Sequence, residues 1–474
     1  GTESARPALV IFYWRPFPSP SSSSLRVRRV LSHVLMANVA WEGSKHTAQG
    51  STCDAFSAPS TDEDNHSNSN SGSDTDDSTA EKGFQEVAQV PEDQCDPHLW
   101  YIHGNAYDLS EYVDRHPGGR LMILSGRGRD CTSLFESYHP WTDRHRRVLQ
   151  SFGPAPPPPD PFYEEIKARV RNAFPRHGKE TKMRLRTKIC LSMMWCVMMV
   201  LFFGVKTPLS CALSGVLMAT AGTRLAHEGG HYQVSSKEWV NRLALFLGYF
   251  PTGPSMNWHY RHVISHHAHT NQDGDHSDVD VAYLWIADML PKWLKLLVLP
   301  GLPVGVMVEI GLKTSFELVV LGKMAGHRAD YWLGHMLPEA FLWFALHMWF
   351  GPSCLCYACM YLVAGAIFVP CSQVAHAIVF PESRVYGSWA KMQIAESVDF
   401  ASTSDFWFHV AMGLTTQVEH HLFPGIGHHC YDTIRLLTRD VCAKHGVTHH
   451  DISARKAFGA LWTRWITGKA VKLD

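Results

Sequence analysis

Histidines recur at helical spacing in one part of this 474-residue chain, beginning at His227. Eight of them fall within fifty residues, and His231 lies four residues after His227. His262 and His266 are also four residues apart, and His267 follows directly. Residues with this spacing share one face of a helix. Because neutral imidazole is the commonest metal ligand in proteins, the stretch predicts a metal site.

A second cluster lies far downstream. Gln417, His420 and His421 occupy positions i, i+3 and i+4 in the sequence QVEHHLF, and His376 ends an earlier QVAH. Imidazoles crowded into one pocket without a metal would be poorly satisfied polar groups. We therefore expect the two clusters to meet, with enough ligands for two metal ions. The candidate histidines are His227, His231, His262, His266, His267, His376, His420 and His421.

The residue types limit which metal such a site holds. The clusters contain no cysteine, which argues against an iron–sulfur centre, and nitrogen-rich sites suit iron, copper or zinc. HEGGH also matches the HExxH pattern, so an intramembrane zinc peptidase using His227, Glu228 and His231 is an alternative. Against it, Gly229 and Gly230 are poor residues for a helix interior, and a catalytic zinc needs only three protein ligands.

Apolar segments must position these clusters. Uncharged runs at about 189–205 and 208–222 form one predicted hairpin, and runs at about 338–350 and 352–371 form another. Each run approaches the length that crosses a bilayer. Residues 293–311 are apolar but interrupted by prolines, so we expect this segment at the membrane interface. The alternative is a soluble protein with large core helices.

The predicted topology keeps every cluster on one side of the membrane. A basic segment at 176–188 precedes the first span, which by the positive-inside rule places the N-terminus in the cytosol. Two spans precede the first histidine cluster, and two more separate it from the last. Both termini and the histidine site are therefore expected to face the cytosol.

A different pair of histidines indicates haem. His116 precedes Pro-Gly-Gly, and His139 follows 23 residues later. Apolar residues between them, such as Leu121 and Phe135, could enclose a haem between two axial imidazoles. A His-Pro-Gly-Gly sequence alone would fit a plain loop equally well. The whole stretch, however, resembles cytochrome b5 over residues 93–150, and the resemblance implies that His116 and His139 are the axial ligands of haem b.

The remaining segments differ in composition. Residues 1–92 include a low-complexity Ser- and Asp-rich run and are expected to be a disordered tail, in which a targeting segment is an alternative. A Pro-rich linker at 151–175 is expected to hold the haem module away from the membrane domain, 176–474. The net charge of −1 gives no sign of a nucleic-acid partner. The haem module favours iron at the histidine site, because zinc has no use for an electron donor.

The three histidine segments together resemble membrane fatty acid desaturases. HEGGH, HVISHHAHTN and FWFHVAMGLTTQVEHHLFP are similar to the three histidine boxes of that family. The fused b5-like module and Gln417 are typical of its front-end group, and the resemblance covers about 93–440. It implies a mainly α fold, in which a multi-span helical membrane domain with a cytosolic histidine-rich cap follows a small α+β cytochrome b5-like domain. Glu228 stands where the family usually has Asp, and HxxxHH in the middle box favours a delta-5 or delta-4 enzyme.

The resemblance also implies an activity. It predicts O2-dependent desaturation of a long polyunsaturated acyl chain, carried on a lipid or coenzyme A, at two non-haem irons. Gln417 would join the eight histidines as a weaker ligand. Electrons would come from NAD(P)H through a separate cytochrome b5 reductase and the haem, within the lipids of the endoplasmic reticulum membrane. A hydroxylase on the same scaffold, or a non-catalytic haem-binding membrane protein, would share most of these residues.

Other polar residues near the clusters receive weaker expectations. Carboxylates that could orient ring N–H groups are Glu228, Asp273, Asp275 and Glu419. Histidines near the site that we do not expect to be ligands are His259, His269, His276 and His409. Histidines expected on the cytosolic surface are His428, His429, His449 and His450.

Overall fold

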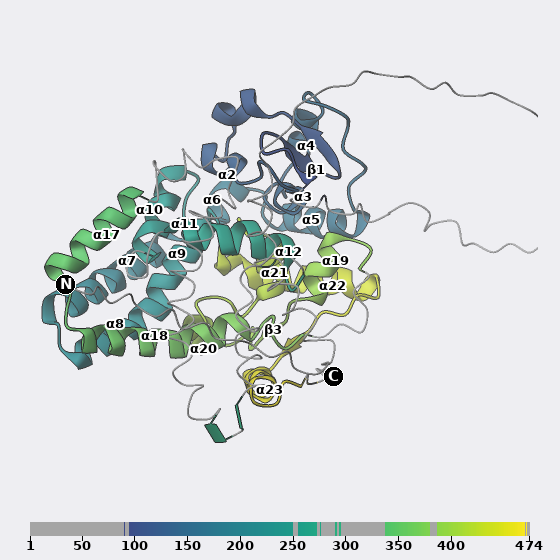
Figure 1. Cartoon of the computed structure of the whole chain (residues 1–474). Coiled ribbons are helices and arrows are strands. Elements are labelled where there is room, and N and C mark those ends of the chain that lie inside the picture. Colours follow the sequence, from purple (N-terminus) through teal and green to yellow (C-terminus); the bar gives the residue numbers. More distant parts are fainter. Residues whose placement is uncertain are drawn as a thin grey trace, which may run out of the picture. The chain divides into compact units, whose positions relative to one another are not determined.

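A computed structural model describes the chain from residue 90 onward, with gaps (Figure 1). The described residues are 90, 94–249, 255–272, 275, 290–291, 293–294, 337–379, 386–469 and 471. All of them belong to one compact unit, Ser78–Asp474. The predicted tail, except for Val90, and most of the predicted interface segment at 293–311 lie outside the described residues.

The first described module is a small α+β domain. Its two strands pair antiparallel, with Trp100 opposite Tyr107, and both of these side chains are buried. The helix before His116 ends at Arg115, and Gly119 takes a φ of +89°, which side chains with a Cβ rarely adopt. The elements are β1 (Trp100–Ile102), β2 (Asn105–Tyr107), η2 (Ser110–Arg115), α2 (Arg120–Leu124), α3 (Thr132–Ser137) and α4 (Arg144–Leu149).

The segment after this module is not simply an extended spacer. Helix α5 (Pro161–Ala173) begins with Pro161 at its first position, and the Asp160 side chain accepts a hydrogen bond from the Phe162 amide. Its apolar face is buried against residues around the third histidine box, including Leu422 and Tyr431. The segment after the small domain thus packs onto the histidine-bearing part of the chain and does not hold the small domain at a distance from it.

A buried ion-pair group ties α5 to the small domain. Glu136 on α3 contacts Arg146 of α4, and its other oxygen lies 3.5 Å from the Lys167 ammonium of α5. The His103 ring lies 2.8 Å from the same carboxylate. Burial by itself raises the pKa of Glu136, but His103, Lys167 and Arg146 outweigh it and hold that pKa at about 2.

Replacing Glu136 with Gln is expected to lower the free energy of unfolding at pH 7 by about 2–3 kcal/mol, because buried cations lose their counter-charge. Since the folded-state pKa is about 2, below the ordinary 4.5, the wild-type stabilisation is complete above about pH 4.5. It is lost as the pH falls toward 2. Urea unfolding of the full chain, followed by haem absorbance, measures both effects. Glu111→Gln, an exposed change in the same domain, should shift unfolding by less than about 0.5 kcal/mol, and equal shifts in both variants would contradict this account.

Three helical segments among the described residues are long and apolar enough to cross a membrane. They are His177–Val205, Pro208–Gly230 and Cys354–Gln373, and they overlap three of the predicted spans, 189–205, 208–222 and 352–371. Thr207 and Ser210 form a capping box that starts the second segment sharply after the first. Gly215 allows close packing of the second segment on the third, because a Cβ there would lie 2.4 Å from the Met360 carbonyl oxygen.

The fourth predicted span, 338–350, forms helix α17 (Leu337–Phe350). The described part of this helix has 14 residues, and the residues directly before it lie outside the described part of the chain. Most of its side chains are apolar and several are exposed, with Phe341 at 73% and Trp349 at 76%. That residues 338–350 cross the membrane therefore stays a prediction.

The spans and the histidine-bearing cap are built from adjoining helices (Figure 1). The first span comprises α6 (His177–Glu180), α7 (Leu185–Met199) and the π-helix η3 (Val200–Val205), and the second comprises α8 (Pro208–Leu217), the π-helix η4 (Met218–Gly222) and α9 (Thr223–Gly230). The next elements are α10 (Glu238–Tyr249), α11 (Ser255–Trp258), the π-helix η5 (His259–His266), α12 (His267–His269) and α18 (Cys354–Gln373). The last are α19 (Trp389–Ala395), β3 (Asp399–Phe400), α20 (Asp405–Val410), α21 (Gln417–Leu422), η8 (His428–Cys430), α22 (Tyr431–Lys444), β4 (Asp451–Ile452) and α23 (Ala454–Thr467).

Candidate metal and haem sites

Four segments that are distant in the sequence bring their histidines into one buried cluster. These segments are the end of α9, the η5–α12 helix, the turn after α18, and α21. His227, His231, His262 and His420 form one group whose possible ligand atoms all lie within 4.8 Å of one another. His266, His376 and His421 form a second such group. These two groups therefore contain seven of the eight histidines that the sequence nominated as metal ligands.

Two further residues complete these groups. The His267 ring stacks on that of His421 of the second group, with centroids 4.3 Å apart. Its Nε2, however, lies 3.3 Å from His262 Nε2, so we place His267 with the first group. The Gln417 amide lies 3.0 Å from His376 Nε2 in the second group. The geometry thus offers five nitrogen donors around one position, and three imidazoles with one amide around another.

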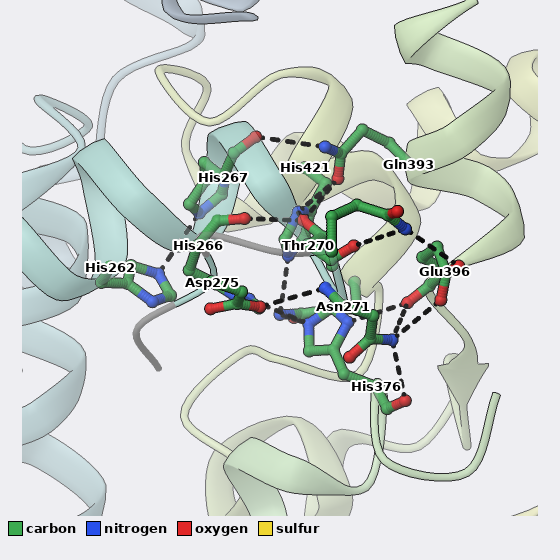
Figure 2. Close-up of polar contacts among 12 residues, drawn as sticks. His262, His266, His267, Thr270, Asn271, Asp275, His376, Gln393, Glu396 and His421 are labelled. Carbon is green, nitrogen blue, oxygen red and sulfur yellow. Dashed lines mark hydrogen bonds and ion pairs between the residues drawn. The ribbon is translucent and has the colours of Figure 1, made fainter. Parts of the chain in front are cut away.

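The inner ring nitrogens face one another at short range. His227 Nε2 lies 3.1 Å from His262 Nε2, and His267 Nε2 lies 3.3 Å from the same atom. In the second group, His266 Nε2 and His376 Nε2 are 3.3 Å apart (Figure 2). Where both rings of a pair carry their proton on Nδ1, two bare lone pairs face each other at these distances and repel, so that arrangement is unfavourable unless something positively charged lies between the nitrogens.

A π-helical turn explains how the second box serves both groups. Residues 259–266 form η5, in which hydrogen bonds run from i to i+5. His262 and His267, five residues apart, therefore point to the same group, whereas His266 points to the other. Spacing on an α-helix would have paired His262 with His266 instead.

The glycines of the first box allow its helix to approach its neighbours. A Cβ on Gly229 would lie 2.6 Å from the Leu245 amide of α10, and one on Gly230 would lie 2.0 Å from the Trp258 ring. Tertiary packing leaves no room for a Cβ at these two positions, so glycine is needed within α9 in spite of its low helix propensity. The close contact places His227 and His231 beside the second box.

Hydrogen bonds to the outer ring nitrogens fix how the rings are turned (Figure 2). His266 Nδ1 lies 2.9 Å from an Asp275 oxygen, so the prediction for Asp275 agrees with the geometry. His376 Nδ1 donates to the Glu396 carbonyl at 3.0 Å. His421 Nδ1 donates to Gln393 Oε1 at 2.7 Å. Each bond places the proton on Nδ1 and leaves the Nε2 lone pair turned inward.

Burial keeps these imidazoles uncharged. It lowers the pKa of His231, His262 and His267 well below the ordinary value, and neighbouring histidines lower it further. The same causes act on the pKa values of His420 and His421. The rings are therefore neutral at pH 7, which is the form that binds metals.

The cluster fits metal ions on three observations. His231 Nε2, His420 Nε2 and Gln417 Oε1 are buried and have no hydrogen-bond partner. Two nitrogens bound to one metal at about 2.1 Å and about 90–110° would lie about 3.0–3.4 Å apart, as the inner nitrogens do. The donors are nitrogens and amide oxygen without thiolate, which suits iron, copper or zinc. A half-turn of the Gln417 amide would present its oxygen, the atom able to ligate, in place of its nitrogen.

Two of the predicted carboxylate partners lie elsewhere. The Arg224 side chain donates to Glu228 at 2.6 Å, and Glu228 also faces His428 at 3.5 Å. Glu419 faces His449 at 3.1 Å. Neither carboxylate therefore contacts a predicted ligand in the described residues. The remaining candidate, Asp273, lies outside them.

The expectation that His428 and His449 lie on the surface is wrong. His428 is 3% exposed because the chain after α21 folds back toward the first box, and Gly413 leaves room for its ring. The side chain of His449 is only 3% exposed, because β4 pairs in parallel with β3 and brings this side chain beside Asp399 and Glu419. His429 and His450 are only partly buried.

A separate cavity of about 450 Å³ lies between His116 and His139. Their ring centroids are 6.2 Å apart, and His116 Nδ1 donates to the Gly119 carbonyl while His139 Nδ1 donates to that of Phe135. Both Nε2 lone pairs therefore remain available as ligands. The other lining residues include Leu109, Tyr112, Met122, Leu134 and Val148. A cavity lined largely by apolar side chains, with two imidazoles placed to act as axial ligands, fits haem b.

Sequence reasoning missed His145 in this cavity. Its ring stacks on that of His139 with centroids 4.8 Å apart and an interplanar angle of 9°. Burial and, to a smaller extent, the neighbouring His139 lower the pKa of His145 to about 3. The ring is therefore neutral and supports the orientation of His139. Its proximity to His139 in the sequence was the only signal available.

An apolar cavity of about 120 Å³ lies against the histidine cluster. Met218, Ala219, Phe368 and Val369 line one part, and His262 and His376 line another. An apolar hollow beside a metal-binding cluster is suited to hold a hydrocarbon chain next to the reactive centre.

The chain thus combines apolar helices of membrane-crossing length, a cavity suited to haem and a separate histidine cluster suited to metal ions, and comparison with known proteins agrees. A fatty acid desaturase family profile matches residues 191–453, and a cytochrome b5-like haem/steroid binding domain matches residues 84–155. The chain belongs to the fatty acid desaturase family and carries a fused b5-like domain, as the sequence motifs predicted.

Several relatives match most of the chain. An acyl-lipid omega-13 desaturase of Chlamydomonas reinhardtii is 27% identical over 79% of this chain and 94% of its own length. A chloroplastic acyl-lipid (7-3)-desaturase from the same organism is 30% identical over 73% of this chain and 76% of its own. An acyl-lipid (8-3)-desaturase of Physcomitrium patens is 27% identical over 76% and 85%. These matches, and the presence of His420 beside His227, do not support the zinc-peptidase alternative.

Proposed function

We propose that the chain introduces a double bond into a long polyunsaturated acyl chain at two non-haem irons. The observation that carries this proposal is the inward-facing set of neutral imidazole nitrogens, some of them buried without a partner. One iron would be held by His227, His231, His262, His267 and His420, and the other by His266, His376, His421 and Gln417. Bound irons would supply the oxygen chemistry that unactivated C–H bonds require.

The residues of the chain position the substrate for this reaction. The overall change is R–CH2–CH2–R′ + O2 + 2e⁻ + 2H⁺ → R–CH=CH–R′ + 2H2O. The apolar cavity beside His262 and His376 would align two adjacent methylenes with the cluster and exclude water from it. The hydrogen bonds from His266, His376 and His421 to their outer partners hold the donor set in place during the reaction.

The fused haem module is proposed to deliver the two electrons. His116 and His139 would hold haem b, which exchanges one electron at a time. An NAD(P)H-dependent cytochrome b5 reductase would be the external donor. The proposed setting is the endoplasmic reticulum membrane, with both termini and the site on the cytosolic side.

Expression in yeast fed one polyunsaturated fatty acid at a time, with gas chromatography and mass spectrometry of the products, tests the proposal. We expect one additional double bond in at least one supplied acid. A product that carries an added hydroxyl group would show the hydroxylase alternative. Separating the phospholipid and coenzyme A pools before analysis identifies the carrier.

A further inference from the structure

Tyr138 connects the haem cavity directly to the histidine cluster. It precedes His139 in the chain, and its hydroxyl oxygen lies 2.7 Å from His231 Nδ1. The Tyr138 and His231 rings are nearly parallel, at 21°. The path from the His139 ring to the His231 ring follows the covalent bonds of His139 and Tyr138 and crosses only this one hydrogen bond.

The direction of the hydrogen bond follows from the cluster. His231 Nε2 is buried among the inner nitrogens without a hydrogen-bond partner. If Nε2 is to bind a metal, the ring proton lies on Nδ1, so His231 donates and the Tyr138 oxygen accepts. Tyr138 therefore accepts a hydrogen bond from Nδ1 of His231, as Asp275 accepts one from Nδ1 of His266.

The two modules are packed together on this side. The Ser125 hydroxyl of the small domain lies 2.9 Å from His259 Nε2 in the second box segment. Met256, Tyr260 and Ile264 of the second box segment belong to the same buried apolar cluster as Trp100 and other core residues of the small domain. The Tyr138–His231 contact thus lies within a packed interface.

We infer that Tyr138 is a positioning residue that couples the haem module to the metal cluster within one chain. This inference rests on the proposed function. Each transfer moves one electron: the donor held by His116 and His139 is oxidised by one electron, the acceptor held by the cluster is reduced by one, and no bond of Tyr138 is broken. The contact serves as a route between the two sites that consists of covalent bonds and one hydrogen bond.

The test uses the purified full-length chain with Tyr138→Phe, which keeps the ring and removes the hydroxyl. The haem is reduced by NADH and cytochrome b5 reductase without oxygen, and its reoxidation is followed by absorbance after oxygen and acyl substrate are added. We expect an unchanged haem spectrum, unchanged iron content and reoxidation slowed by at least about tenfold. Tyr101→Phe is the matched control, because its hydroxyl accepts from the Asp96 amide and lies outside the haem cavity.

Each other outcome has a definite meaning. Reoxidation of Tyr138→Phe at the wild-type rate would overturn the inference while leaving the proposed function intact. Loss of iron, or failure of a small-molecule reductant to restore desaturation in Tyr138→Phe, would also overturn it, because Tyr138 would then only shape the metal site. Recovery with that reductant would support electron coupling. A wild-type chain that forms no double bond would instead contradict the proposed function.

Discussion

Replacing His420 with Ala is expected to lower desaturation by more than about 100-fold, beyond the 10–100-fold typical for residues that only support a ligand. His420 lies on α21, and its ring faces those of His227, His231 and His267. Its loss removes one of five nitrogen donors from the first group. Product formation from a fed acyl chain gives the activity, and metal analysis of the purified chain gives the iron content.

A matched control separates this effect from general damage. His409→Ala changes a histidine that is close in sequence but exposed. We expect wild-type product levels from His409→Ala, and an intact haem spectrum in both variants. Normal activity in His420→Ala would contradict a shared metal centre and would revive a site made from the first box alone.

Replacing either His116 or His139 with Ala is expected to abolish the b5-type haem spectrum, because each supplies one axial imidazole. NAD(P)H-supported desaturation should fall by more than about 100-fold, while non-haem iron remains bound. Absorbance spectroscopy and product analysis on the same preparation measure both effects. His98→Ala, an exposed change in the same module, should leave the haem spectrum unchanged.

Two other results would change the ligands or the role that we assign to the haem module. If His139→Ala retained a six-coordinate haem, His145 would be the replacement ligand, since it stacks on His139 within the cavity. If haem were lost but NAD(P)H-supported desaturation continued at the wild-type level, the fused module would not be the required donor.

The convergence of the metal-binding residues could be predicted from sequence because it depends on periodicity. Spacings of three and four place His420 and His421 with Gln417 on one side of α21, as observed. Uncharged runs similarly indicated the apolar helices. Both signals are local in the sequence and do not depend on tertiary contacts.

The division of the histidines between two groups could not be predicted in the same way. It depends on the π-helical geometry of η5, and nothing in the histidine spacing distinguishes a π-turn from an α-turn. The hydrogen bond between Tyr138 and His231 joins residues that are 93 positions apart in the sequence. The burial of His428 depends on how the chain folds back after α21.

The central claim is that two irons lie between neutral imidazoles from distant segments, beside a haem in the same chain. Iron and zinc content per purified chain, compared with haem content by pyridine haemochrome assay, tests it most directly. The account predicts about three irons per chain, one of them in haem, with little zinc. Iron equal to haem alone, or one zinc per chain in place of the non-haem iron, would contradict it.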